Sequence, residues 1–175
     1  MTRRQFIPVG VIIERREIDN PWQDYSYHPV AVVPGMAAMD EGAEWRLIRE
    51  GEGWTHFHAA TLELELFPGE TAGYKSNLSN FQPHIYVVLA PGEEAEDAEV
   101  IPTLVTACPY EAESYMEDSD MIVEGVPMPD ELAAWIGAFV DAHHVEETFQ
   151  KRKNKKAYDP RKGGFRPRPL VETDE

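Results

Sequence analysis

Apolar, β-branched residues occur in short runs through the N-terminal half of the chain, and turn-forming residues separate the runs. The first two runs, 9–13 and 29–33, flank the turn signal Asp19-Asn20-Pro21. Val, Ile and Tyr favour a pleated, half-buried surface, and an Asn-Pro dipeptide is extended or turning. We therefore predict that residues 6–33 form a strand, a turn and a returning strand. Three aromatic residues accompany the turn: Trp22, Tyr25 and Tyr27.

Five further segments have the composition or the alternation of strands. In residues 54–67, three leucines alternate with threonine and glutamate between positions 61 and 66, which is the period of a strand with one solvated face. Pro102 interrupts the last segment, which indicates an edge strand or a bulge. Together with the first two strands this predicts about seven strands at hairpin spacing. The five segments are 44–49, 54–67, 71–77, 83–89 and 99–107.

The pattern changes to a helical one towards the C-terminus. Residues 109–128 are irregular and acidic, and Pro129-Asp130-Glu131 then places a proline and two acids where a helix N-terminus favours both. Apolar residues follow at helical spacing. We predict an amphipathic helix at about 129–150. Residues 151–175, rich in Pro, Gly and basic side chains, are expected to form a mobile tail.

These elements predict a mainly β, β-rich α+β fold in a single domain over residues 1–150. The length of 175 residues is enough for one core. About seven antiparallel strands would form a barrel or a sandwich, with the C-terminal helix packed across it. This arrangement is similar to pleckstrin-homology-like or EVH1-like modules in architecture, and architecture does not define function.

Charge is distributed unevenly along the chain, whose formal net charge is −16. Residues 1–149 contain seven basic and 28 acidic residues, a net charge of −21. Residues 150–175 contain nine basic and four acidic residues, a net charge of +5. An acidic body repels nucleic acid and anionic membrane, whereas the basic tail can attract a polyanion, an acidic partner or the body itself.

Cysteine content and hydropathy indicate a cytoplasmic protein. The single cysteine, Cys108, excludes an intramolecular disulfide framework and favours a reducing compartment. It has no Cys-x-x-Cys partner, so we expect a buried, inert thiol. No signal peptide is recognisable, and no segment approaches the roughly 20 apolar residues of a membrane helix.

The sharpest chemical pattern is His56 and His58, followed by Glu63. Alternate residues of a strand project to one face, so the two imidazoles can share a metal ion. The spacing resembles the first metal motif of cupin barrels. However, Glu63 faces away from His58 unless a bulge intervenes, and the second cupin motif is absent. We favour the alternative that both histidines are partly buried polar residues of the sheet.

Other catalytic patterns are missing from the sequence. Gly51-x-Gly53 precedes a strand rather than a helix, so it is no dinucleotide-binding loop. There is no Gly-x-Ser-x-Gly elbow and no helical His-Glu-x-x-His. His143-His144 lies near the predicted helix end, where favourable interaction with the helix dipole is sufficient explanation. No cofactor is predicted.

The basic residues between 151 and 168 are interleaved with Tyr158 and Phe165. Such a segment can bind RNA through phosphate contacts and stacking. We favour a solvated tail or a protein partner, because the acidic body opposes a polyanion. The candidate partner-binding residues are Trp22, Tyr25, Tyr27, Lys151, Arg152, Lys153, Lys155 and Lys156.

Several segments resemble an uncharacterised bacterial family. They are GVIIERREIDNPWQDYSYHPVAVVPG, ELELFPGETAGYKSNLSN, HIYVVLAP, the helix opened by Pro129-Asp130, and the KRK at 151–153. Members of that family resemble proteins encoded beside formate dehydrogenase and molybdenum-cofactor accessory genes. Some are labelled molybdopterin-guanine dinucleotide biosynthesis proteins, but a guanylyltransferase needs a nucleotide-binding α/β layout that this β-rich pattern lacks. The resemblance implies a context and no catalytic residues.

We therefore expect a non-enzymatic binding or accessory protein with a protein partner. The resemblance implies that the partner is a molybdenum enzyme such as formate dehydrogenase, whose maturation or assembly the chain would assist. The alternative is a small metal-dependent, cupin-like enzyme that uses His56, His58 and Glu63.

Overall fold

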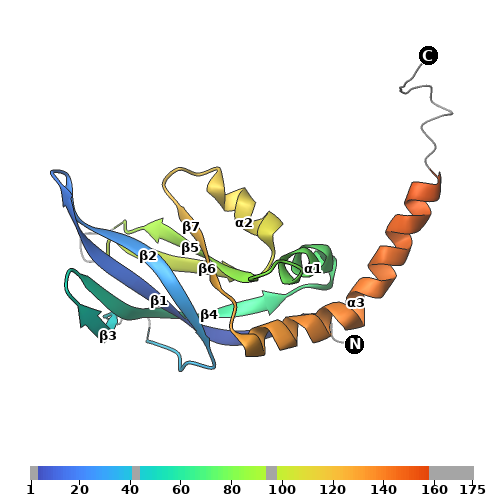
Figure 1. Cartoon of the computed structure of the whole chain (residues 1–175), viewed down its shortest axis with the longest axis horizontal. Coiled ribbons are helices and arrows are strands. Elements are labelled where there is room, and N and C mark those ends of the chain that lie inside the picture. Colours follow the sequence, from blue (N-terminus) through green and yellow to red (C-terminus); the bar gives the residue numbers. More distant parts are fainter. Residues whose placement is uncertain (1–3, 41–43, 94–97, 158–175) are drawn as a thin grey trace, which may run out of the picture.

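The computed structural model describes residues 4–40, 44–93 and 98–157, with residues 144–157 as backbone only. Seven strands and three α-helices account for most of these residues (Figure 1). In chain order the elements are β1 (Gln5–Asn20), β2 (Gln23–Pro34), β3 (Arg46–Gly51), β4 (Trp54–Leu66), the 3-10 turn η1 (Pro68–Glu70), α1 (Thr71–Leu78), β5 (His84–Pro91), β6 (Val100–Thr106), α2 (Pro109–Met116), β7 (Ile122–Pro127) and α3 (Asp130–Ala157).

The strands form two antiparallel sheets with the orders β2-β1-β4-β3 and β6-β5-β7. The predicted hairpin of residues 6–33 is therefore confirmed as β1 and β2. At its tip the Asn20 side-chain oxygen accepts a hydrogen bond from the Trp22 amide at 2.7 Å, an Asx-type turn. Strand β5 is central and β6 is an edge strand, as its Pro102 predicted.

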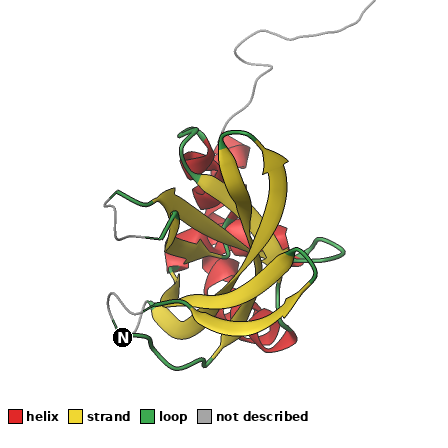
Figure 2. Cartoon of the chain, turned by 90° about the vertical axis from the view of Figure 1, so that its left-hand side faces the viewer, coloured by secondary structure: helices red, strands yellow, loops and turns green. Residues whose placement is uncertain are grey.

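The inner faces of the two sheets pack on each other around one core. Burial of each aliphatic side chain in this core stabilises the fold by about 1.5–3 kcal/mol, before the entropy cost of ordering the chain is subtracted. In Figure 2, viewed from the hairpin end, the strands form the front of the molecule and the helices lie behind them. The principal core residues from the sheets are Val9, Val11, Ile13, Leu64, Leu66, Ile85, Val87, Leu89, Val105 and Val126.

The sheets remain open, so the predicted barrel does not form. Strand β4 contacts β6, and β2 lies against β7. In the described part of the chain, however, no backbone hydrogen-bonded ladder joins β4 to β6 or β2 to β7. The fold is α+β with two facing sheets.

The predicted strand at 71–77 is wrong, because these residues form helix α1. Thr71, Tyr74 and Asn77 are buried at a spacing of three residues, which is the period of a helix face. Two of these three are polar, so hydrophobic periodicity does not reveal them. The Tyr74 hydroxyl accepts a hydrogen bond from the Phe67 amide at 2.9 Å, which fixes α1 against the end of β4.

Residues 109–128 are regular rather than irregular. Pro109 opens α2, where its missing amide hydrogen costs nothing, and residues 122–127 form β7 on the edge of the smaller sheet. The count of seven strands is thus right although one member differs, because β7 replaces the segment 71–77.

Helix α3 is longer than predicted and packs in a different place. It extends from Asp130 to Ala157 and contacts α1 and η1 rather than crossing a sheet. Residues 158–175, which include most of the predicted mobile tail, lie outside the described residues. No helix in the described part of the chain is long and apolar enough to cross a lipid bilayer. The side chains that α3 buries are Leu132, Ile136, Phe139 and Val140.

Candidate functional site

The outer face of the four-stranded sheet, turned away from the core, carries most of the chemically interesting side chains. Register defines this face, because paired residues of neighbouring strands point to the same side. Glu14 of β1 pairs with His28 of β2 and with His56 of β4, so all three lie on it. We call this set the outer-face cluster; its members are Glu14, Arg16, His28, Arg46, Arg49, Trp54, His56 and His58.

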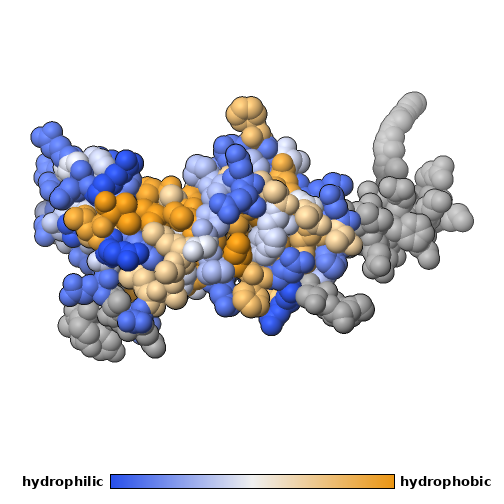
Figure 3. All heavy atoms as spheres, turned by 90° about the horizontal axis from the view of Figure 1, so that it is seen from below, coloured by the Kyte–Doolittle hydropathy of each residue, from blue (hydrophilic) through white to orange (hydrophobic). Residues whose placement is uncertain are grey.

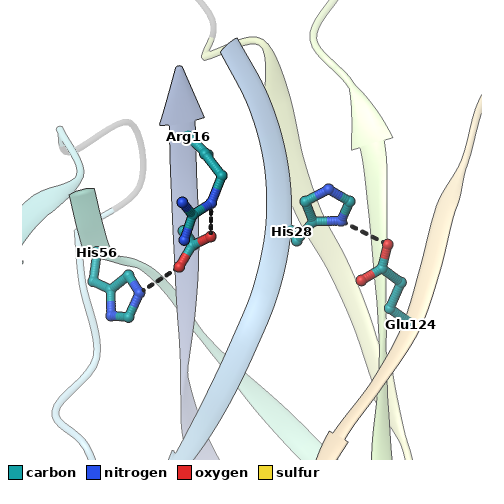
Figure 4. Close-up of polar contacts among 5 residues, drawn as sticks. Arg16, His28, His56 and Glu124 are labelled. Atoms are coloured by element: carbon teal, nitrogen blue, oxygen red, sulfur yellow. Dashed lines mark hydrogen bonds and ion pairs between the residues drawn. The ribbon is translucent and has the colours of Figure 1, made fainter. Parts of the chain in front are cut away.

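Glu14 is the centre of one network in this cluster (Figure 4). Arg16 Nε donates to Glu14 Oε2 at 2.9 Å, and His56 Nε2 lies 2.9 Å from Glu14 Oε1. The hydrogen bond from Arg16, followed by that from His56, lowers the pKa of Glu14 below its ordinary value. The ring of Trp54 lies 4.6 Å from that of His56. His56 is therefore held by a carboxylate and an indole of the sheet itself.

His58 is fully buried and belongs to a second network. Arg46 Nη2 lies 3.0 Å from His58 Nδ1, and because arginine only donates, Nδ1 must be the acceptor. Neutral His58 then donates from Nε2 to Thr61 Oγ1 at 2.9 Å, and Thr61 donates to the Ala37 carbonyl at 2.8 Å. This chain of donors ties the β2–β3 connection to the sheet and requires a neutral imidazole.

Stability is expected to fall as the pH decreases through the range just below 6.5, because of His58. Burial, and then the charge of Arg46, lower the pKa of His58. The unfolded chain therefore takes up a proton at a pH where the folded protein does not, so the free energy of unfolding decreases by up to about 1.4 kcal/mol per pH unit. Urea unfolding between about pH 7.5 and about pH 5.5 measures this slope while avoiding the lower titration range of Glu14. The His58→Gln variant should lose the slope; an unchanged slope would assign it to other groups.

The residues predicted to bind a metal, His56, His58 and Glu63, are not gathered into a metal centre. A bulge at Ala59 does place all three on the outer face, because Ile12 pairs with His58 and Pro8 pairs with Glu63. However, Thr61 lies between His58 and Glu63 on that face. No group of three or more His, Cys, Asp or Glu side chains in the described residues is arranged to hold a metal ion. The two histidines instead contact Glu14, Arg46 and Thr61.

His28 connects the two sheets. Its Nδ1 lies 2.7 Å from Glu124 Oε2 of β7 (Figure 4). Both side chains are largely exposed, so solvent screens the pair. It is a side-chain contact between β2 and β7, which no backbone ladder joins in the described residues.

The structure separates the three aromatic residues predicted to bind a partner. Tyr25 and Tyr27 pack within the molecule: the Arg15 guanidinium lies 4.4 Å from the Tyr25 ring, and Tyr27 lies 6.0 Å from Trp45. Trp22, at the hairpin tip, is 87% exposed. Of the three, only Trp22 is free to meet another molecule.

The few basic residues of the acidic body are concentrated in the four-stranded sheet. Arg15, Arg16, Arg46 and Arg49 account for four of the seven basic residues in positions 1–149. Three of the four lie on the outer face, where Glu14 is the one acidic member of the cluster. The outer-face cluster therefore carries more basic than acidic side chains, unlike the acidic body around it.

A cleft of about 480 Å³ lies between η1 and α2, lined by Phe67, Glu70, Tyr110 and Glu111. Neutral donors hold both carboxylates: Glu70 accepts from the Cys108 thiol at 3.0 Å, and Glu111 accepts from the Thr106 hydroxyl at 2.6 Å. A wide opening leaves this space accessible to water.

Cys108 is buried beneath this cleft, as predicted. Burial, and then its hydrogen bond to Glu70, raise the pKa of the Cys108 thiol to about 11. The thiol is therefore protonated at neutral pH and is a poor nucleophile. A Cβ atom on Gly73 would come within 2.5 Å of the sulfur, so α1 approaches this thiol only because residue 73 is glycine.

The basic residues of the predicted partner-binding set lie at the distal end of the long helix. The backbone of Lys151, Arg152, Lys153, Lys155 and Lys156 belongs to the last turns of α3. Their side chains are outside the described part of the structure.

Sequence reasoning predicted a strand at 44–49, which is confirmed as β3, but it missed that β3 is an edge strand and it missed the partners of the histidines. All six residues of β3 are exposed, including Leu47 and Ile48. A usable signal was present, because Arg46 and Arg49 are scarce basic residues in an acidic body. Glu14 lies 42 residues before His56, and no local pattern connects them.

Comparison with known proteins yields a family and no individual relative. No curated protein and no solved structure matches the chain. The likeness to pleckstrin-homology-like modules therefore stays a prediction. One family model, described as "Protein of unknown function (DUF3305)", matches residues 8–153. Because this match covers most of the 175 residues, the chain belongs to the DUF3305 family.

Proposed function

We propose that this chain is a non-enzymatic accessory protein that binds a partner protein through the hairpin end of its four-stranded sheet. The observation that carries the proposal is Trp22, a large apolar side chain that is 87% exposed at the tip of the β1–β2 hairpin. Tryptophan is enriched among the residues that dominate binding energy at protein interfaces. A hairpin of two long strands, extending from the body in Figure 1, presents it away from the core.

The hairpin tip is preorganised for such a contact. The Asn20 side chain fixes the Trp22 amide, so little backbone freedom is lost when a partner binds. Asp19 and Asp24 flank the turn and are exposed. A partner suited to this tip offers an apolar pocket with a basic rim.

The chemistry of the outer-face cluster supports binding over catalysis. His56 and His58 are held by Glu14 and by Arg46 with Thr61. The Cys108 thiol, with its raised pKa, is not an activated nucleophile. These groups stabilise the sheet, and the cupin-like alternative would require them to exchange their present partners for a metal.

For the partner, we propose a molybdenum enzyme such as formate dehydrogenase, whose maturation or assembly the chain would assist. The support for this choice is the sequence resemblance described above. The exposed hairpin tip is compatible with any large protein partner, so the identity of the enzyme needs a direct binding measurement.

Replacing Trp22 by alanine is expected to weaken binding of purified formate dehydrogenase from the native host by about 30-fold, the effect of losing an interface hot spot of about 2 kcal/mol. Isothermal titration calorimetry measures the affinity. Phe81→Ala is the matched control, because Phe81 is a fully exposed aromatic residue on the loop between α1 and β5.

Equal binding by wild type and Trp22→Ala would show that the hairpin tip is not the interface. Absence of binding by the wild-type chain would exclude this enzyme as partner. Equal loss in Trp22→Ala and Phe81→Ala would indicate a non-specific apolar contact.

A further inference from the structure

Strand β3 is an edge strand whose outer side is unpaired in the described structure. It pairs with β4 on one side and ends the sheet on the other. All six of its residues are exposed, and Leu47 and Ile48 are 53% and 44% exposed. Unpaired backbone groups beside exposed apolar side chains form a template on which another strand can pair.

The two faces of β3 offer different chemistry to such a strand. Leu47 pairs with Phe57 and Glu50 pairs with Thr55, so both point to the inner face. Arg46 and Arg49 point to the outer face, because Ile48 forms a bulge between Leu47 and Arg49. A strand beside β3 would therefore place alternate side chains next to Leu47 and Glu50 on the inner face and next to two guanidinium groups on the outer face.

Arg46 and Arg49 both have guanidinium hydrogen-bond donors that a bound segment can use. Arg49 lies over the Trp54 ring at 5.7 Å, and in the described residues no ion pair to a carboxylate involves it. Arg46 uses Nη2 towards His58, which leaves its other donors available. A guanidinium pairs best with a carboxylate, through charge-assisted and often bidentate hydrogen bonds.

We propose that β3 accepts an extended acidic segment of a partner protein as a fifth strand of the sheet. Backbone hydrogen bonds to β3 provide the affinity. Carboxylates of the segment contact Arg46 and Arg49, and its alternate apolar side chains cover Leu47. This inference rests on the proposed function, that the chain binds a protein, and names the chemistry of one part of that partner.

Charge selects this occupant over a second copy of the chain. Two β3 strands paired with each other would bring the arginines of both copies to the same face, and like charges opposite each other are destabilising. A basic segment would likewise meet Arg46 and Arg49. Arginines and a bulge also serve to block unwanted edge pairing, but a purely protective edge gains nothing from exposing Leu47 and Ile48.

The test uses a fluorescein-labelled peptide of alternating glutamate and valine and the full-length chain, with fluorescence anisotropy as the measurement. The expected result is saturable binding that weakens with added salt, because screening reduces the contribution of exposed charges. A peptide of alternating lysine and valine should bind at least about tenfold more weakly, since repulsion replaces attraction.

Peptide N-methylation separates strand addition from simple charge attraction. Alternate residues of a paired strand direct their amide hydrogens towards β3. Two peptides are therefore compared, one N-methylated at every glutamate and the other at every valine. The peptide whose methyl groups point towards β3 should lose binding, and the other should keep it. Equal binding by both methylated peptides would overturn the proposal, because it would show that backbone pairing is not involved.

Arg49→Glu should weaken binding of the glutamate–valine peptide by about fivefold or more, since one favourable exposed pair becomes a repulsive one. Arg46 is avoided as a first test because it also holds buried His58. Lys75→Glu on α1 is the matched control: it makes the same charge change at an exposed position of a different element. Equal effects of the two substitutions would mean that net charge alone controls binding.

The peptide measurement and the Trp22 measurement test the two proposals separately. If no peptide binds while the Trp22-dependent affinity for a partner protein persists, the β3 inference is wrong and the accessory function stands. If the acidic peptide binds β3 but the partner affinity does not depend on Trp22, the hairpin-tip interface is wrong and strand addition stands.

Discussion

Replacing Phe139 by alanine is expected to lower the free energy of unfolding by about 3–5 kcal/mol, the range for truncation of a buried aromatic residue. Phe139 is 2% exposed and packs with its ring 6.1 Å from that of Tyr74. It is one of the residues through which α3 is joined to α1. Since a domain of this kind is stable by about 5–15 kcal/mol, such a loss is a large share of the total.

Urea unfolding followed by circular dichroism measures the effect of Phe139→Ala. Phe81→Ala provides the control: Phe81 is fully exposed, so its truncation should change stability by no more than about 0.5 kcal/mol. A change as small as this in Phe139→Ala would mean that α3 detaches from the body at little cost.

Replacing Asn77 by alanine is expected to cost about 3 kcal/mol or more, because buried backbone groups lose their partners. The Asn77 amide donates to the carbonyls of His84 at 2.7 Å and Ala107 at 2.9 Å, and its oxygen accepts from the His84 amide at 3.0 Å. One side chain thus connects α1 with the start of β5 and the end of β6. Asn77 is itself fully buried.

The matched control for this substitution is Asn80→Ala, which removes an exposed asparagine three residues later. Its expected effect on urea unfolding is within about 0.5 kcal/mol. Asn77→Asp should be at least as damaging as Asn77→Ala, because it directs a carboxylate at two carbonyl oxygens. If Asn77→Ala unfolds like the wild type, water replaces the side chain and the three hydrogen bonds are not structural.

Sequence patterns predicted the elements whose solvent exposure alternates with the element's own period. Leu62, Leu64 and Leu66 are on the inner face of β4 as the period-2 pattern required, because one face of that strand is wet and the other dry. Helix α1 was missed because it buries polar Thr71 and Asn77, and the partners of Asn77 are backbone groups of His84 and Ala107. No local pattern encodes those partners.

Sequence reasoning placed the candidate site on the correct strand but not its contacts. The His56-x-His58 spacing correctly put two imidazoles on one face, and the bulge at Ala59 brought Glu63 to that face as well. The acidic partner of His56 turned out to be Glu14 on the neighbouring strand. Register between strands decides such pairs, and register depends on bulges that the sequence does not mark.

The length of helix α3 sets the distance between a partner bound at the hairpin tip and one bound at the C-terminal end of the helix. Its 28 residues correspond to a rod of about 42 Å, and the buried side chains described on it end at Val140. Figure 1 shows the rest of the helix leading away from the body, on the side opposite the hairpin.

A binding partner held by the C-terminal turns, at Lys151–Lys156, would therefore sit tens of ångströms from one held at Trp22, about 25 Å of that distance coming from the helix beyond Val140. A stiff helical spacer fixes this separation, whereas a flexible linker would average over many. Simultaneous engagement of both ends then gains avidity only for a target whose two contact points match the span. The chain would discriminate between assemblies by their size as well as by their surface chemistry.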